Sequence, residues 1–311
     1  MMSENTESPE KPQFTVASRN SNEIHERDTK AQDDDRRKQV MELLEASKDK
    51  NFVFLFGPPG SGKTAVLGTI LQSMHRGDVH GKFYVHGASE KSHYKRGADL
   101  WTRIRSSFAD KRFPARSDVT KTIELHVEYK HPANPDPVHI VFLEMAGDNF
   151  DLVKLNERGE KLPIHIKQFL SIPNINIMFL IVAPWRTDRR GISLVVDFLA
   201  FVNEHAPNLV GSRVILLISQ WDQYPLRSTK SVEQFALEEM TEVYQKINSN
   251  NNVIRSYSVG TVLHDDTGAG DIIMDFDHTA SQQLFARIYE TFTGIRFVPP
   301  NHRPWWRRIF S

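Results

Sequence analysis

The sequence predicts an α/β fold, with a mostly parallel central sheet, one antiparallel strand and helices on both faces. Short apolar segments alternate with amphipathic ones along most of the chain, a pattern typical of parallel sheets covered on both sides. The alternating segment 120–129 and the apolar segment 138–143 flank a proline-bounded turn at 132–137, so they form a hairpin in which one strand is antiparallel. The third observation is a glycine-rich loop directly after the first apolar strand, 52–56.

The other elements follow from residue periodicity. A helix is expected over 63–74, after the glycine-rich loop, and another is indicated by the helical spacing of Leu100, Trp101, Ile104 and Phe108. The predicted helices in the rest of the chain are 36–47, 164–170, 194–202, 232–247 and 281–292. The predicted strands of the carboxyl-terminal half are 177–183, 214–219 and 253–259.

Composition divides the 311 residues into three regions. Residues 1–35 are polar and charged, and we expect them to be disordered because they cannot bury enough apolar surface to offset the entropy of ordering. Residues 36–295 are expected to form one α/β domain, with an inserted segment at about 79–117. Residues 296–311 form a basic, aromatic tail that suits docking on its own domain, a protein groove or peripheral contact with a membrane surface.

Charge and residue counts exclude several classes of function. Lysine plus arginine and aspartate plus glutamate are both 39, so we expect no nucleic-acid partner. The absence of cysteine excludes disulfides, thiolate zinc sites and thiol catalysis. The thirteen histidines follow no metal-ligand spacing. With no signal-peptide core and no apolar run long enough to span a bilayer, a cytoplasmic location is expected.

Residues 57–64 read Gly-Pro-Pro-Gly-Ser-Gly-Lys-Thr, the Walker A pattern of P-loop NTPases. Glycines let the backbone curl so that successive N–H groups face one anion, and the following helix directs its positive dipole end at the same point. Lys63 is expected to reach the β- and γ-phosphates, and the Thr64 hydroxyl to ligate Mg²⁺. The predicted phosphate contacts are Gly57, Pro58, Pro59, Gly60, Ser61, Gly62, Lys63, Thr64 and Ala65.

Polar residues follow three other predicted strands, where parallel-sheet enzymes bind ligands. Glu144 suits Mg²⁺ binding through water, and Gly147 an N–H contact to the γ-phosphate. Asp222 suits acceptance of the two donors on the guanine edge, or alternatively backbone capping after a strand. Ser258 and Val259 lie in a small-residue turn that suits an N–H contact to guanine O6.

The order of these motifs resembles the Ras-like, translation-factor-related (TRAFAC-type) class of GTPases, and within it the divergent bacterial double-GTPase type. The resemblance covers about 52–292. It implies Glu144–Gly147 in the place of Asp-x-x-Gly, Ser219–Asp222 in the place of Asn-Lys-x-Asp, and Ser258–Gly260 in the place of Ser-Ala-Lys.

The sequence departs from that pattern in ways that bear on chemistry. Glu144 replaces a shorter aspartate, and Ser219-Gln220 replaces an Asn-Lys pair whose cation would lie along the base. Gln220 is nevertheless in the position of a base contact. Asp148 stands where the resemblance implies the glutamine that orients the attacking water.

Two further sets of candidates remain open. Thr120 or Thr122 would supply the switch hydroxyl for Mg²⁺, although both equally suit ordinary strand positions. An arginine acting on the phosphates in cis would come from the inserted segment, although a solvated helix face suits each single candidate better. Its candidates are Arg103, Arg105, Arg112 and Arg116.

Together the motifs predict a GTP-binding molecular switch that hydrolyses GTP slowly unless a protein partner assists, with Mg²⁺ and bound GTP or GDP. Lys63, Gly147 and Asp148 are the predicted catalytic residues. One alternative is a P-loop ATPase, because the amino-acid sequence of this loop is common among ATPases. The other is a nucleotide-binding scaffold without hydrolysis.

Overall fold

The computed structural model describes the residues that carry most of the predicted domain. They are 50–76, 81–87, 89–91, 94–114, 123–132, 134, 136–144, 176–205, 214–248, 252–263 and 271–297. The predicted helices 36–47 and 164–170, the polar segment 1–35 and most of the tail lie outside these residues.

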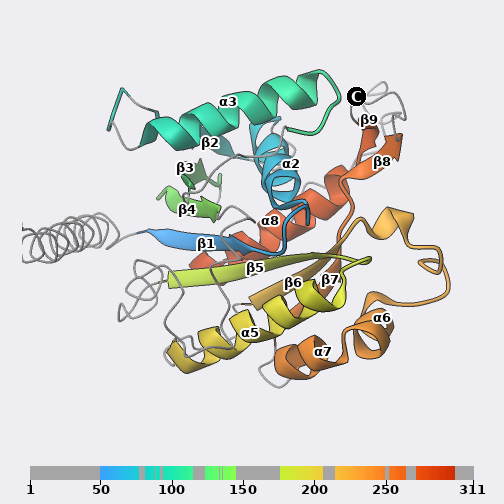
Figure 1. Ribbon diagram of the computed structural model, residues 1–311. Helices are drawn as coiled ribbons and strands as arrows, with labels where there is room; N and C mark the ends of the chain where they lie inside the picture. Colours follow the sequence, from blue (N-terminus) through green and yellow to red (C-terminus); the bar gives the residue numbers. More distant parts are fainter. Residues whose placement is uncertain are drawn as a thin grey trace, which may run out of the picture. The chain divides into compact units, whose positions relative to one another are not determined.

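A seven-stranded sheet forms the centre of the described structure, in the order β2-β3-β4-β1-β5-β6-β7 (Figure 1). Its strands are β1 (Asn51–Phe56), β2 (Lys82–Val85), β3 (Ile123–Lys130), β4 (Val138–Glu144), β5 (Asn176–Pro184), β6 (Val214–Ser219) and β7 (Val253–Ser256). β3 pairs antiparallel with β2 and β4, and the other neighbouring strands pair in parallel. One strand of this sheet is thus reversed, and the predicted fold class is confirmed.

Helices cover both faces of the sheet (Figure 1). One layer holds α2 (Lys63–His75), α3 (Lys95–Ala109) and α8 (His278–Thr293), and the other holds α5 (Arg189–His205), α6 (Val232–Glu239) and α7 (Thr241–Asn248). In the described chain, none of the helices is sufficiently long and apolar to traverse a bilayer.

Strand β1 supplies side chains to both layers because successive residues of a strand point to opposite faces. Val53 and Leu55 are fully buried in the core formed with α2, α3 and α8. On the other face, the Phe56 ring stacks on Phe198 of α5 with 3.6 Å between ring centroids, and Phe54 lies 5.9 Å from the same ring. Burial on both faces explains why this strand is a continuous apolar run.

Several elements differ from the periodicity prediction. The predicted helix 232–247 is two helices, because Met240 leaves helical geometry with φ −131° and ψ 42°. β2 was not predicted, since four residues with a half-exposed pattern give too short an alternation. A separate antiparallel pair, β8 (Gly260–Leu263) and β9 (Ile272–Phe276), was also missed, and residues 264–270 between its strands lie outside the described structure.

The strand register brings the predicted motifs to one edge of the sheet. Leu55 of β1 is level with Glu144 of β4. Ser219 of β6 is level with Pro184 of β5, and Ser256 of β7 with Ile218. The carboxyl ends of these parallel strands therefore meet where the glycine-rich loop begins.

Candidate nucleotide-binding site

The loop between β1 and α2 has the backbone that an anion cradle requires. Gly60 and Gly62 have φ of 73° and 89°, in the left-handed region that favours glycine. Ser61 N–H donates to the Pro58 carbonyl at 3.1 Å, which closes the turn. A Cβ on Gly57 would lie 2.1 Å from the Val182 carbonyl oxygen, so only glycine fits against β5 there.

Lys63 begins α2 and turns its side chain back into this loop. Its ammonium group donates to the carbonyls of Gly57 at 2.8 Å and Pro58 at 3.1 Å, and the residue is 6% exposed. α2 has no acidic residue in its first turn and no side-chain cap at Gly62. A buried cation and uncapped helix N–H groups therefore face the same loop, an arrangement suited to phosphate.

Thr64 and Glu144 form the second half of the cradle. The Thr64 hydroxyl donates to Glu144 Oε1, and Glu144 is 3% exposed at the end of β4. Burial raises the pKa of the Glu144 carboxyl, while the Thr64 hydrogen bond and the positive charges of Lys63 and Arg103 oppose that rise.

The donor set of this pair fits Mg²⁺. Within the described residues, Glu144 Oε2 is buried without a hydrogen-bond partner. Buried polar atoms normally have partners, so an orphaned carboxylate oxygen beside a threonine hydroxyl indicates room for a ligand that is not protein. Hydroxyl and carboxylate oxygens are the ligands that Mg²⁺ prefers.

Arg103 of α3 is the one of the four candidate arginines whose charge acts on Glu144 in the described structure. Arg105 instead lies over the Trp101 ring at 5.9 Å, and Arg112 forms an isolated bridge with Ile272. Close packing of α3 on β3, where a Cβ on Gly97 would lie 2.3 Å from the Glu124 carbonyl oxygen, fixes this helix. Arg116 lies outside the described residues.

Ser219 has a role that its motif position did not predict. Its hydroxyl donates to the Ser61 carbonyl at 2.8 Å, and both residues are buried. The end of β6 is therefore fastened to the phosphate loop. The signal available in the sequence was a small hydroxyl residue ending an otherwise apolar strand.

Two of the predicted base-binding residues, Asp222 and Ser258, lie together beyond Ser219, whereas Gln220 and Val259 do not line the cavity that they share. Gln220 has a left-handed backbone (φ 56°) and precedes the short 3₁₀ helix η3 (Trp221–Gln223). Trp221 N–H donates to the Tyr257 carbonyl at 3.3 Å, which joins this loop to the end of β7. As a result Asp222 and Ser258 line one cavity of about 730 Å³, between β6, β7 and α8. No phosphate-loop residue lines that cavity.

An aromatic group not predicted from the sequence supports the Asp222 loop. The Trp221 and Tyr224 rings are 4.7 Å apart, Tyr224 is 5.4 Å from Trp185, and Trp221 meets Phe235 edge-on at 5.5 Å. Val259 packs against the core and its carbonyl accepts from Asp277 N–H at 2.9 Å. The loops after β5, β6 and β7 are thus held by packing and backbone bonds.

Four predicted site residues lie outside the described structure: Gly147, Asp148, Thr120 and Thr122. Their roles stay predictions. The described residues nonetheless place a Walker A loop after β1, a buried carboxylate at the end of β4, and an antiparallel β3 beside it. This is the α/β fold of a P-loop NTPase.

Comparison with known proteins gives similarity in structure only. No family model and no curated protein matches the sequence. The structure of Roco2 RocCORdC from Methanosarcina barkeri bound to GDP matches with 11% identity and a TM-score of 0.40, over 84% of this chain and 55% of that one. The chain thus spans about half of the Roco2 chain.

Two chloroplast translocon structures also match. One, described as showing that dimerization is important for the GTPase activity of atToc33 and psToc159, has 11% identity and a TM-score of 0.44, covering 86% of this chain and 92% of that one. The other, a dimerization-deficient mutant of Toc33 from Arabidopsis thaliana, has 12% identity and a TM-score of 0.42, with 84% and 93% covered.

Proposed function

We propose that this chain is a GTP-binding switch that hydrolyses GTP slowly and regulates a protein partner. The observation that carries this proposal is the hydrogen bond between Thr64 and Glu144 beside the buried Lys63. This hydrogen bond joins the phosphate loop, which would hold the γ-phosphate, to the end of β4. The predicted γ-phosphate sensor, Gly147, follows that strand in the sequence.

In this proposal Lys63 leaves the loop carbonyls and binds the β- and γ-phosphates when nucleotide enters. The present bonds to the Gly57 and Pro58 carbonyls hold its charge in the loop until then. Thr64 and Glu144 would hold Mg²⁺, directly and through its water shell respectively. The ion, when bound, neutralises charge that develops on the phosphate oxygens.

Asp222 would select guanine, because a carboxylate can accept from both N1–H and the exocyclic amine, a pair that adenine does not present. Ser258, Val259 and Gln220 would surround the base. The shared cavity of Asp222 and Ser258 supports this placement of the two loops side by side.

Slow hydrolysis follows from the predicted position of Asp148. An ionised aspartate there would repel the γ-phosphate and could not orient water as glutamine does. Gly147 would sense the γ-phosphate, with Thr120 or Thr122 completing the metal site, so that the bound state differs in its surface from the free state. A protein partner would bind one of the two states more tightly than the other. It would also supply the water-orienting group that fast hydrolysis requires.

ATP is the second candidate ligand, favoured by one observation. The Ser219 hydroxyl donates its hydrogen bond to the Ser61 carbonyl, so it is not available to the base. Gln220 follows in place of a lysine, and the motif therefore has no cation that could lie along a guanine ring. Calorimetry with the Mg²⁺ complexes of GTP and ATP separates the two. Phosphate release then distinguishes a switch, which turns over slowly, from a scaffold, which does not turn over.

A further inference from the structure

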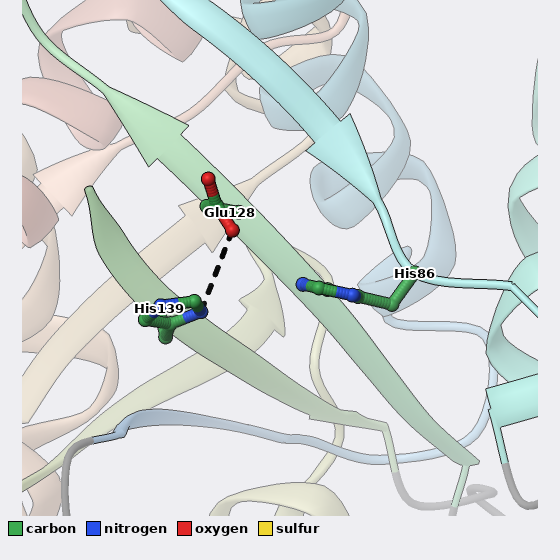
Figure 2. A group of neighbouring side chains, drawn as sticks. All are labelled: His86, Glu128 and His139. Atoms are coloured by element: carbon green, nitrogen blue, oxygen red, sulfur yellow. Dashed lines mark ion pairs between the residues drawn. The ribbon is translucent and has the colours of Figure 1, made fainter. Parts of the chain in front are cut away.

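Three side chains from neighbouring strands converge on the far side of the hairpin from the helices α2, α3 and α8. His86 follows β2, Glu128 is in β3 and His139 is in β4, and one ligand atom of each lies within 4.8 Å of the others. Figure 2 shows the His86 ring pointing toward the Glu128–His139 pair. We propose that these three residues bind a transition-metal ion, for which Zn²⁺ is the best chemical match.

Sheet register produces this group. Glu128 and His139 are direct cross-strand partners, and His139 Nδ1 lies 3.9 Å from Glu128 Oε2. His86 N–H donates to the His126 carbonyl at 3.0 Å, which continues the pairing just past β2. Strand residues far apart in sequence therefore share one face, and this explains why histidine spacing along the chain gave no metal signal.

The group is separate from the nucleotide site. His139 and Glu144 are five positions apart on β4, which corresponds to about 17 Å along a strand. The neighbours of His139 on the strand, Val138 and Ile140, point into the helix-covered core, so His139 faces the opposite side. All three ligands are only partly buried, which leaves a path for an ion.

Glu90 orients the first ligand as a metal site requires. Its Oε2 is hydrogen-bonded to His86 Nδ1, while its Oε1 accepts from the Tyr84 hydroxyl at 2.7 Å and from Gly87 N–H at 3.2 Å. With Nδ1 occupied, His86 presents Nε2 to the ion, which is the carboxylate–histidine–metal arrangement found around zinc.

The ligand types select the metal. Two imidazoles and one carboxylate suit Zn²⁺ and its first-row neighbours, whereas Mg²⁺ and Ca²⁺ prefer oxygen alone. Zinc ligands lie about 2.0–2.2 Å from the ion, so the three side chains would close toward one another and water would complete the tetrahedron. Binding would join the residue that follows β2 to the hairpin, since β3 and β4 contribute the other two ligands.

Without an ion, the same contacts contribute little. The contact between His139 and Glu128, whose side chains are 38% and 34% exposed, is weak because water screens it. Two imidazole nitrogens and a carboxylate oxygen that converge on one point are better matched to a divalent cation.

The test uses untagged full-length protein, stripped with chelator, dialysed and titrated with Zn²⁺ alone. Wild type is expected to retain about one equivalent by atomic emission. His139→Ala and Glu128→Gln should each lose it. His278→Ala, which removes a histidine of α8, is the matched control and should retain it. Glu90→Gln should weaken Zn²⁺ binding by about 10- to 100-fold.

Two further measurements guard against misfolding and against binding at the nucleotide site. Zn²⁺ should raise the melting temperature of wild type but not of Glu128→Gln, a near-isosteric change whose circular dichroism should match wild type. Zn²⁺ should also persist in Lys63→Ala and in excess Mg²⁺. Wild type that retains no Zn²⁺, or Zn²⁺ that survives in His139→Ala and Glu128→Gln, would overturn the proposal.

Discussion

Thr64 at the start of α2 donates a hydrogen bond to Glu144 at the end of β4, 80 residues later in the chain. The contact joins a helix that follows the phosphate loop to a strand that precedes the predicted switch residues Gly147 and Asp148. In the proposed switch, nucleotide bound at the loop would act on Gly147 and Asp148 through this side-chain pair.

Lys63→Ala should abolish nucleotide binding. The ammonium group is the buried cation of the loop, and two charge-assisted bonds to phosphate at about 1.5 kcal/mol each correspond to at least about 100-fold in affinity. Calorimetry with GTP and Mg²⁺ measures the loss. Lys130→Ala, which removes an exposed lysine at the end of β3, should bind as wild type does. Unchanged affinity in Lys63→Ala would contradict the loop assignment.

Glu144→Gln should weaken Mg²⁺-dependent binding while leaving binding in chelator nearly unchanged, because the amide keeps an oxygen for Thr64 but loses the charge. Paired titrations with Mg²⁺ and with chelator separate the two effects. If nucleotide affinity falls equally with Mg²⁺ and with chelator, Glu144 supports the structure of the site but does not bind the metal ion.

The same variant should alter how stability depends on pH. Burial raises the pKa of Glu144, so the folded state holds this proton more tightly than the unfolded state. Its contribution to stability is therefore present below the unfolded pKa and is lost as pH rises through the folded pKa. Urea unfolding in chelator at a series of pH values should show a shallower decline above about pH 4.5 for Glu144→Gln than for wild type. If stability falls with pH equally in the variant and in wild type, Glu144 is not the source of the pH dependence.

Arg103→Ala should slow single-turnover hydrolysis of GTP by about 100-fold, the effect of removing one preorganised donor from a reacting oxyanion, with affinity largely kept. The reason is that its charge acts on Glu144 and hence at the metal end of the site. Arg105→Ala removes a neighbouring arginine of α3 that lies over Trp101, and serves as the matched control. A similar rate for both variants would assign hydrolysis to residues elsewhere.

Ser219→Ala should destabilise the fold by about 1–3 kcal/mol, because the buried Ser61 carbonyl loses its side-chain donor. Urea unfolding measures this change. Ser256→Ala, at the exposed end of the adjacent β7, should have little effect. If the two variants unfold alike, Ser219 does not hold the phosphate loop.

The sequence was sufficient for the main architecture because its strongest signals are local. The glycine pattern at 57–64 requires a loop backbone that Gly60 and Gly62 do adopt, and the proline-bounded turn at 132–137 predicted the reversed strand β3. Helix boundaries were less exact. The break at Met240 arises from backbone geometry that apolar periodicity does not report.

Contacts made by tertiary structure could not be predicted in this way. Ser219 was expected in a base-recognition motif, but its hydroxyl is bonded to the phosphate loop. The convergence of His86, Glu128 and His139 depends on strand register, and β2 itself was too short to predict. Arg103 was one of four equal candidates until the packing of α3 on β3 brought its charge to Glu144.

The most direct test of the account is nucleotide selectivity in wild type and Asp222→Asn. Calorimetry should compare the Mg²⁺ complexes of GTP, ATP and xanthosine triphosphate. The account predicts that wild type prefers GTP to ATP, and that Asp222→Asn loses GTP affinity by about 100-fold, the loss of two hydrogen bonds to a charged group, while gaining xanthosine triphosphate. A wild type that prefers ATP, or a variant with unchanged GTP affinity, would contradict it.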